Sequence, residues 1–194
     1  MAEISKVWNK VPETYRGIVL FLLCLFASNF LWKLTISGDQ SEGGVVTFCG
    51  FDISCVFSDA TFWFAEKTHR LLALLGVQTQ LVMDKVSYAN GNGSKIIAGC
   101  TAIKQFYMMT VILLFSRGKS VHKIWYWLLS IVVLVGYNIL RLALLTYIVR
   151  DHREYFDFMH EHVMKYIFYG VMFLLWLMWD EWLRNKLSKK SEAD

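Results

Sequence analysis

The sequence predicts an all-α membrane protein with about four transmembrane helices, an extracytoplasmic amphipathic helix and a small β-hairpin. Two observations carry this prediction. The chain of 194 residues is 56% hydrophobic and 16% aromatic, whereas soluble domains are nearer half apolar. It also contains four apolar runs, and three of them are close to or above the roughly 17 residues that form the lower limit for a bilayer-spanning helix.

The predicted spans follow these apolar runs. They cover residues 17–34, 101–116, 124–149 and 160–182. Together with the extracytoplasmic segment 35–99 they form one integral membrane domain of residues 1–194. The second span is the shortest and carries Lys104 and Gln105 in its first turns, so its ends must lie in the interface. The first run lacks a small-x-small cleavage site, which favours a span over a cleaved signal peptide.

Basic residues are concentrated in three segments that adjoin the spans. The N-terminus, the connection 117–123 and the C-terminal tail are rich in lysine and arginine. Because cytoplasmic loops carry an excess of these residues, the pattern places the three segments in the cytoplasm and residues 35–99 outside. Nucleic-acid binding is not expected, since membrane topology already explains why each basic cluster adjoins a span.

The external segment is predicted to contain a helix and a hairpin. Residues 57–75 are apolar but include Glu66, Lys67, His69 and Arg70, which favours a helix in the membrane interface. The other interpretation is a further span, which would place the N-terminus outside. Alternating apolar residues over 77–83, the sequence Asn-Gly-Asn-Gly at 90–93 and a second strand over 95–98 predict the hairpin.

Four cysteines differ in their surroundings. Cys24 lies inside the first predicted span and is interpreted as a small apolar residue. Cys49 and Cys55 lie six residues apart in the external segment, where they either form a short-loop disulfide or remain thiols. Their spacing and the lack of a nearby histidine do not suit a metal site. Cys100 stands where a strand is expected to run into a membrane helix.

Three polar side chains are predicted to lie at one depth. Cys100, Arg141 and His160 are 17, 18 and 20 residues from the cytoplasmic ends of their helices, counted from residues 117, 123 and 180. At 1.5 Å per residue these separations are about 26, 27 and 30 Å. The hydrocarbon core is roughly 30 Å thick, and the helices alternate in direction. All three side chains are therefore expected at the external face.

A thiol, an imidazole and a guanidinium group can together perform acyl-transfer chemistry. The thiol attacks an acyl carbon, the imidazole takes its proton and later protonates the leaving amine, and the guanidinium stabilises the oxyanion. Cys100 is expected on the first turn of a helix, where unpaired amides favour a thiolate. The simpler alternatives are a cysteine that only packs, an arginine that snorkels to the interface and an ordinary interfacial histidine.

Three further residues are candidates for supporting or substrate-binding roles. Asn138 precedes Arg141 by three residues on the same helix face, where it can orient the guanidinium or bind substrate backbone. Lys104 follows Cys100 by one turn and either favours the thiolate or snorkels. His162 points about 200° away from His160 on a helix, so only one of them faces the cysteine. His162 is the second candidate for the base.

Three motifs together resemble a known family. They are a cysteine that opens a membrane helix, "NILR" late in the next helix and "FDFMHEH" opening the last one. The pattern is similar to the exosortase/archaeosortase family of membrane cysteine transpeptidases or proteases. The short chain and its closing "YGVMFLLWLMWDEW" are most similar to the compact F-like exosortases of Bacteroidetes. The resemblance runs roughly from residue 71 to 182.

The resemblance implies a catalytic set of Cys100, Arg141 and His160. The family often has Cys-Ser-Gly at the nucleophile, whereas this chain has Cys100-Thr101-Ala102, in which Thr101 can replace the serine hydroxyl. No metal or organic cofactor is implied.

The expected substrates are exported proteins with a C-terminal sorting signal, which consists of a short motif, a membrane helix and a basic tail. Membrane lipids are the other expected contact. The resemblance implies a multi-pass protein of the bacterial cytoplasmic (inner) membrane, with its active site facing the periplasm. From another functional class, the alternative is a non-catalytic scaffold or lipid-binding assembly protein in which Arg141 binds a lipid phosphate.

Overall fold

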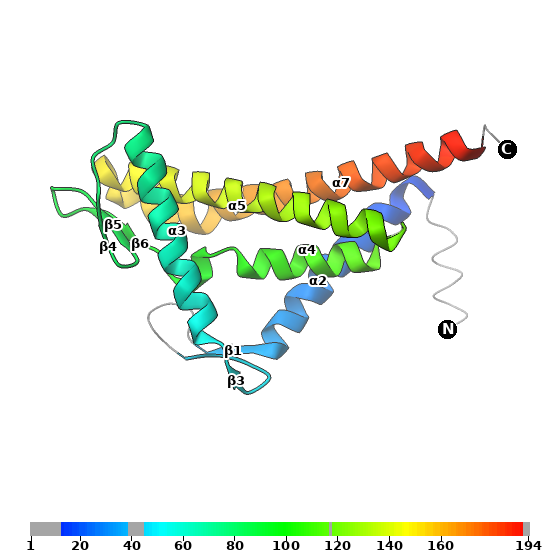
Figure 1. Cartoon of the computed structure of the whole chain (residues 1–194), viewed down its shortest axis with the longest axis horizontal. Helices are drawn as coiled ribbons and strands as arrows, with labels where there is room; N and C mark the ends of the chain where they lie inside the picture. The colour runs from blue at the N-terminus through cyan, green and yellow to red at the C-terminus, as the bar shows by residue number, and fades with distance from the viewer. Residues whose placement is uncertain (1–12, 39–44, 117, 192–194) are drawn as a thin grey trace.

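The computed structural model describes residues 13–38, 45–116 and 118–191. The chain is mostly helical, as predicted, with two small antiparallel sheets. Helices α4 (Ile103–Phe115), α5 (Ser120–Asp151) and α7 (Met164–Ser191) run along the long axis of the molecule (Figure 1). Helix α2 (Glu13–Thr35) is inclined to them, and α3 (Ser54–Leu74) crosses one end of the bundle.

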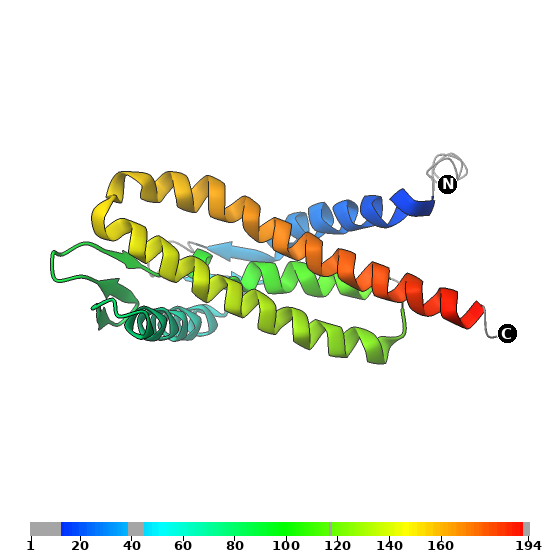
Figure 2. The same cartoon turned by 90° about the horizontal axis from the view of Figure 1, so that it is seen from above.

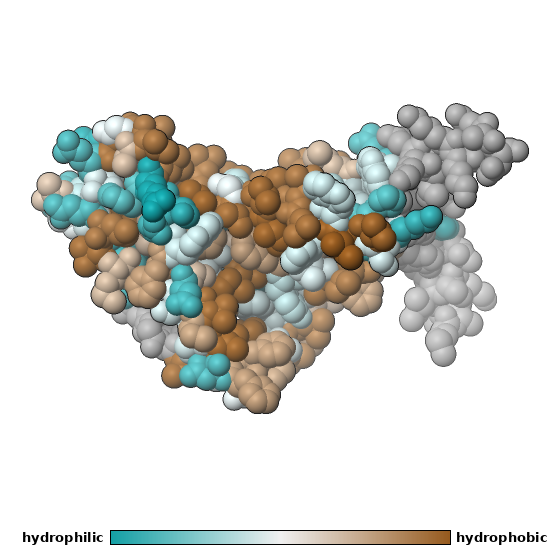
Figure 3. All heavy atoms as spheres, in the orientation of Figure 1, coloured by the Kyte–Doolittle hydropathy of each residue, from teal (hydrophilic) through white to brown (hydrophobic). Residues whose placement is uncertain are grey.

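Two described helices are long and apolar enough to cross a bilayer by length and composition. They are Tyr15–Thr35 within α2 and the whole of α5. Helix α4 is apolar but has only 13 residues, which is about 20 Å and less than the thickness of the hydrocarbon core. Figure 3 shows apolar surface over the middle of the molecule and hydrophilic side chains towards its ends. This distribution is typical of a membrane protein.

Contacts among α2, α4, α5 and α7 form the core of the bundle. Phe21 of α2, Met109 of α4, Leu134 of α5 and Met172 of α7 are each almost completely buried. By contrast, Phe26 of α2 is 68% exposed on the outer surface. An exposed phenylalanine in the middle of an apolar helix is expected where the solvent is lipid.

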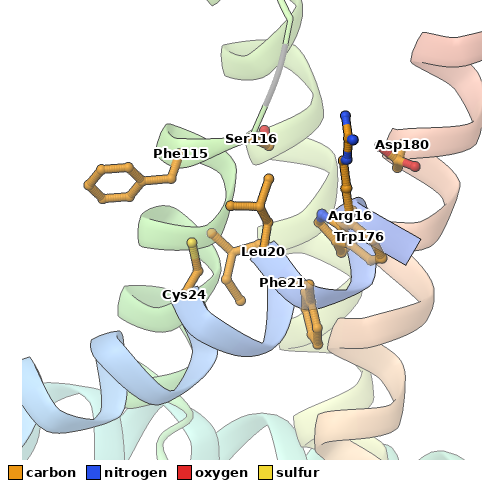
Figure 4. Close-up of a pocket in the computed structure, with 10 residues that line it drawn as sticks. Arg16, Leu20, Phe21, Cys24, Phe115, Ser116, Trp176 and Asp180 are labelled. Atoms are coloured by element: carbon orange, nitrogen blue, oxygen red, sulfur yellow. The ribbon is translucent and has the colours of Figure 1, made fainter. Parts of the chain in front are cut away.

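Helices α2 and α7 approach closely at the end of the bundle opposite α3. A Cβ atom on Gly17 would lie 3.3 Å from the Trp176 ring, so only a very small residue fits there without a shift. The Phe21 ring centroid is 5.0 Å from that of Trp176. Figure 4 shows this end, where Arg16 points towards Asp180 beside a small cavity. From this contact α2 inclines away from α7 (Figure 1).

Helix α3 lies across the bundle end and is seen end-on in Figure 2. Its buried residues recur at helical spacing on one face: Phe57, Thr61, Phe64, Ala65, Thr68 and Leu72. Its other face carries an ion pair between Glu66 and Arg70, and the Lys67 ammonium lies 5.5 Å from the Trp63 ring centroid. This arrangement agrees with an amphipathic helix lying in the interface, because a span would run along the bundle.

The predicted hairpin differs from the structure, which has three strands here. They are β4 (Gln80–Val82), β5 (Lys85–Ser87) and β6 (Gly93–Lys95). Val82 pairs with Lys85 across a two-residue turn, and Met83 enters the left-handed region at φ 55°. That turn contains no glycine, and therefore it has none of the residue pairs that predict a two-residue hairpin turn. The Asn-Gly-Asn-Gly turn joins β5 to β6, and the second predicted strand covers Gly93–Lys95 rather than 95–98.

A second small sheet was not predicted. Strand β2 (Val46–Phe48) pairs with β1 (Ile36–Gly38) on one side and with β3 (Phe51–Asp52) on the other. The connection between β1 and β2 includes residues 39–44, which lie outside the described residues. Cys49 and Cys55 flank β3, and both are exposed thiols.

The β4–β6 sheet is attached to the C-terminal end of α5 by several hydrogen bonds. The hydroxyls of Ser94 and Thr146 are 2.5 Å apart, and the Tyr88 hydroxyl donates to the Thr146 carbonyl at 3.1 Å. Burial raises the pKa of Tyr88, so this hydroxyl remains a protonated donor. The Asn90 and Asn92 amides donate to the Arg150 carbonyl at 3.3 and 3.1 Å. These bonds fix the strand that leads directly to Cys100.

We expect Thr146→Val to destabilise the protein. Valine keeps the shape of threonine but removes the hydroxyl that contacts Ser94 and donates to the Leu142 carbonyl at 2.8 Å. The buried Ser94 hydroxyl then loses a partner, at a cost of about 1–3 kcal/mol. Thermal unfolding in detergent should show a Tm lower by several degrees. Thr35→Val is the control, because the Thr35 hydroxyl bonds to carbonyls of its own helix. Equal losses in both variants would contradict the proposed attachment.

Candidate active site

Cys100 and His160 are in direct contact at the bundle end that carries α3. The Cys100 Sγ atom lies 3.3 Å from His160 Nε2, within hydrogen-bonding distance for sulfur. The two residues come from different elements, since Cys100 ends the 3-10 turn Ala98–Cys100 and His160 lies in the π-helical turn Met159–Val163 that precedes α7. Cys100 is 5% exposed. The fold therefore brings a buried thiol and an imidazole together across 60 residues of sequence.

The expectation that Cys100 and Thr101 belong to the first turn of a membrane helix is wrong. Helix α4 begins only at Ile103, because Ala102 adopts the left-handed conformation at φ 59° and interrupts the helical path. The Cys100 amide donates to the Ile97 carbonyl at 2.8 Å. Cys100 therefore stands before α4 and not on its first turn, and His160 is a close polar neighbour of the thiol.

The two residues after Cys100 show how the Thr-Ala pair is accommodated. Thr101 is completely buried, and its hydroxyl donates to the Ala98 carbonyl at 2.7 Å, which closes the 3-10 turn. Ala102 occupies a backbone conformation that glycine adopts without strain. A glycine at this position would suit the same turn.

The two candidate histidines lie in the same π-helical turn, Met159–Val163. His160 stacks on Phe156 with ring centroids 5.6 Å apart, and His162 stacks on Phe158 at the same distance. His160 is partly buried against Cys100, whereas His162 is exposed. Single π-helical turns are frequent at functional sites. The structure therefore directs His160 to the thiol and His162 to the outside.

Asn138 connects Cys100 to Arg141. Its amide Nδ2 donates to the Cys100 carbonyl at 2.8 Å. Its Oδ1 faces Arg141 Nη1 at 3.5 Å, which is long for a hydrogen bond. Both residues lie on the inner face of α5, where Asn138 is fully buried and Arg141 is 6% exposed. The guanidinium is thus one side chain away from the Cys100 backbone.

A cavity of about 280 Å³ adjoins this group. Lys104, Arg141 and His160 line it, so three of the predicted site residues share one space. Its aromatic walls include Trp32 of α2 and Tyr169 of α7. An acyl substrate that enters this cavity meets the imidazole and the guanidinium together.

Three further side chains of this environment were not among the predicted site residues. They are Phe156, which stacks on His160, and Lys165 and Tyr169, which line the cavity. The spacing of Phe156 from His160, and of Phe158 from His162, is a signal that could have been used, because residues four apart on a helix contact each other. Lys165 lies in the first turn of α7, and only the tertiary structure brings it near Lys104.

The other histidines and cysteines lie elsewhere. His69 Nδ1 is 2.7 Å from the Thr79 hydroxyl near β4, and the His122 ring contacts Trp182 at the opposite end of the bundle. All four cysteines are in the described part of the chain, and none of them forms a disulfide. Among the described residues, no group of three or more His, Cys, Asp or Glu side chains could hold a metal ion.

The fold and the site define a helical membrane protein with a buried cysteine–histidine pair and a neighbouring arginine. Residues 56–178 match the family model of transmembrane exosortases, and the chain belongs to this family. The match extends from α3 to α7 and includes Cys100, Arg141 and His160. Membership indicates, in general, a membrane transpeptidase or protease of the cysteine type. Searches of curated proteins and of solved structures gave no match.

Proposed function

We propose that this protein is a membrane-embedded cysteine protease or transpeptidase that cleaves C-terminal sorting signals of exported proteins. The observation that carries the proposal is the 3.3 Å contact between Cys100 Sγ and His160 Nε2, in a chain that belongs to the exosortase family. A nucleophile within hydrogen-bonding reach of a base is the arrangement that covalent catalysis needs.

In the proposed first half-reaction, His160 Nε2 accepts the Cys100 thiol proton and the sulfur attacks the scissile carbonyl carbon. The carbonyl oxygen becomes an oxyanion, which the Arg141 guanidinium stabilises. The tetrahedral intermediate then collapses, the C–N bond breaks, and His160 gives its proton to the leaving amine. The N-terminal part of the substrate remains on Cys100 as a thioester, and the released tail carries the new amino group.

The second half-reaction resolves the thioester. His160 takes a proton from a water molecule or from an acceptor amine, and the resulting nucleophile attacks the thioester carbon. The C–S bond breaks and the sulfur recovers the proton from His160. Water gives a free carboxylate and an amine gives a new amide bond. Asn138 orients the Cys100 backbone and the guanidinium throughout.

The proposed topology has four spans, formed by α2, α4, α5 and α7, in the bacterial cytoplasmic membrane. The start of α2, the α4–α5 connection and the end of α7 lie at one end of the bundle (Figure 1). That end carries the basic segments, including Arg16, Lys119 and Lys123, and the positive-inside tendency makes it cytoplasmic. The thiol, the imidazole and α3 then face the periplasm. A substrate tail with its own membrane helix would bring its scissile bond to this level.

Substitution of Arg141 tests this function against a non-catalytic role. In cells that co-express a substrate with a C-terminal sorting signal, Arg141→Ala should lower tail release by roughly 10²-fold or more, and Arg141→Lys should recover only part of it. Arg150→Ala is the control, because Arg150 is exposed and its side chain lies beside Asp151 at 3.6 Å. Unchanged tail release in Arg141→Ala would exclude the proposed role of the guanidinium. If the protein were a lipid-binding scaffold, even the wild type would release no tail.

A further inference from the structure

The cavity beside Cys100 and His160 has a strongly cationic lining. Lys104 of α4, Arg141 of α5 and Lys165 of α7 contribute to it. Among the described residues that line it, none is aspartate or glutamate. Cations that repel one another beside a low-dielectric membrane are stabilised by a bound anion.

The arginine in this cavity has an unused donor. Arg141 is 6% exposed, and its Nε atom is completely buried without a hydrogen-bond partner among the described residues. A buried donor of a charged group that lacks a partner costs free energy. The guanidinium presents five N–H groups in one plane, so it can face Asn138 with Nη1 and still bind an anion with another donor. The buried donor and the two lysines together offer the donors and positive charge that an anion requires.

The position of the cavity favours a phosphate group. Its lysines lie in the first turns of α4 and α7, where the helices reach the end of the bundle that carries α3 (Figure 1). Trp32 and Tyr169 line the same cavity, and such rings are enriched at the level of lipid headgroups. Lys165 is an exposed residue of this lining. A phospholipid can therefore place its phosphate among the cations while its acyl chains remain in the bilayer.

We propose that the cavity lined by Lys104, Arg141 and Lys165 binds the phosphate of an outer-leaflet phospholipid headgroup beside the Cys100–His160 pair. The inference rests on the proposed function only for the depth and orientation of the site in the membrane. A lipid held there occupies part of the space that the substrate enters, so lipid composition would influence substrate binding at this site.

Native mass spectrometry of the full chain in detergent tests the proposal. The probes are dioleoyl phosphatidylglycerol and a dioleoyl glycosyl glycerol, which has the same acyl chains without phosphate. The wild type should bind the phospholipid more tightly than the glycolipid. Lys104→Gln with Lys165→Gln should weaken phospholipid binding by roughly tenfold or more. The matched control is Lys85→Gln with Lys95→Gln, which removes the same charge from exposed strands and should leave binding unchanged.

Other binding results would contradict the proposed lipid site. Equal binding of the two lipids, or equal loss in the control variant, would overturn the proposal. If the protein bound inorganic phosphate but not the phospholipid, the anion site would remain, but a lipid would be excluded as its ligand. The proposal would also be overturned if the protein bound neither the lipid nor phosphate, and instead bound a carboxylate-bearing peptide through the same lysines.

The same binding measurement on Cys100→Ala separates this inference from the proposed function. This variant should bind the phospholipid like the wild type, because the thiol is not required for the anion site. If it binds the lipid and still releases substrate tails, the proposed catalytic function fails and the lipid site remains.

Discussion

Cys100→Ala is expected to abolish tail release, with a loss of at least roughly 10³-fold in rate. The proposed chemistry passes through a thioester on this sulfur, and removal of a covalent nucleophile leaves no equivalent path. Cys100→Ser should be nearly as inactive, because a hydroxyl is a much weaker nucleophile at neutral pH. The measurement is the rate at which purified protein in lipid nanodiscs releases the tail from a substrate with a sorting signal.

The remaining cysteines provide controls for this substitution. Cys24→Ala, Cys49→Ala and Cys55→Ala should each retain tail release, since the thiol that contacts His160 is that of Cys100. The Cys100→Ala protein should also keep its thermal unfolding midpoint within a few degrees, because the exchange removes a single buried sulfur atom. Tail release that survives in Cys100→Ala would rule out the cysteine mechanism.

The second large effect is expected from a matched pair of histidine substitutions. His160→Gln should lower the rate of tail release by about 10² to 10⁴-fold, which is the range that general acid–base catalysis contributes. His162→Gln should leave the rate nearly unchanged. The two positions have the same residue type, lie in the same π-helical turn and stack on equivalent phenylalanines, but only His160 contacts the thiol.

This pair separates catalysis from structure. Loss of one His–Phe stacking contact should affect the folding of both variants to a similar degree, and thermal unfolding checks this. A comparable loss of activity in both variants, or a larger loss in His162→Gln, would contradict the assignment of His160 as the base.

The meeting of Cys100, Arg141 and His160 could be predicted because it depends on regular geometry. Helical rise is constant, so counting from the cytoplasmic ends placed the three residues at one depth. Counting gives depth only, and it does not say which helix faces turn towards each other. Tertiary packing decides that, through the π-helical turn at Met159–Val163 and the Asn138 contact with the Cys100 carbonyl.

The features that could not be predicted depend on backbone conformations without a sequence signal. Met83 and Ala102 both have positive φ, although neither is a glycine, an asparagine or an aspartate. The turn at Met83 adds a third strand to the predicted hairpin, and Ala102 delays the start of α4 to Ile103. The cationic cavity was also hidden, because Lys104 and Lys165 are 61 positions apart (165 − 104) and only the packing of α4 against α7 joins them.

The central claim is that Cys100 forms a covalent acyl-enzyme, and mass spectrometry tests it most directly. Purified protein in nanodiscs is mixed with a substrate that carries a sorting signal, and the reaction is quenched with acid during turnover. We predict an adduct with the mass of the N-terminal substrate fragment, which maps to Cys100, is released by neutral hydroxylamine and is absent from Cys100→Ala. Release of the tail with the adduct on another residue, or at an undiminished rate in Cys100→Ala, would contradict the claim.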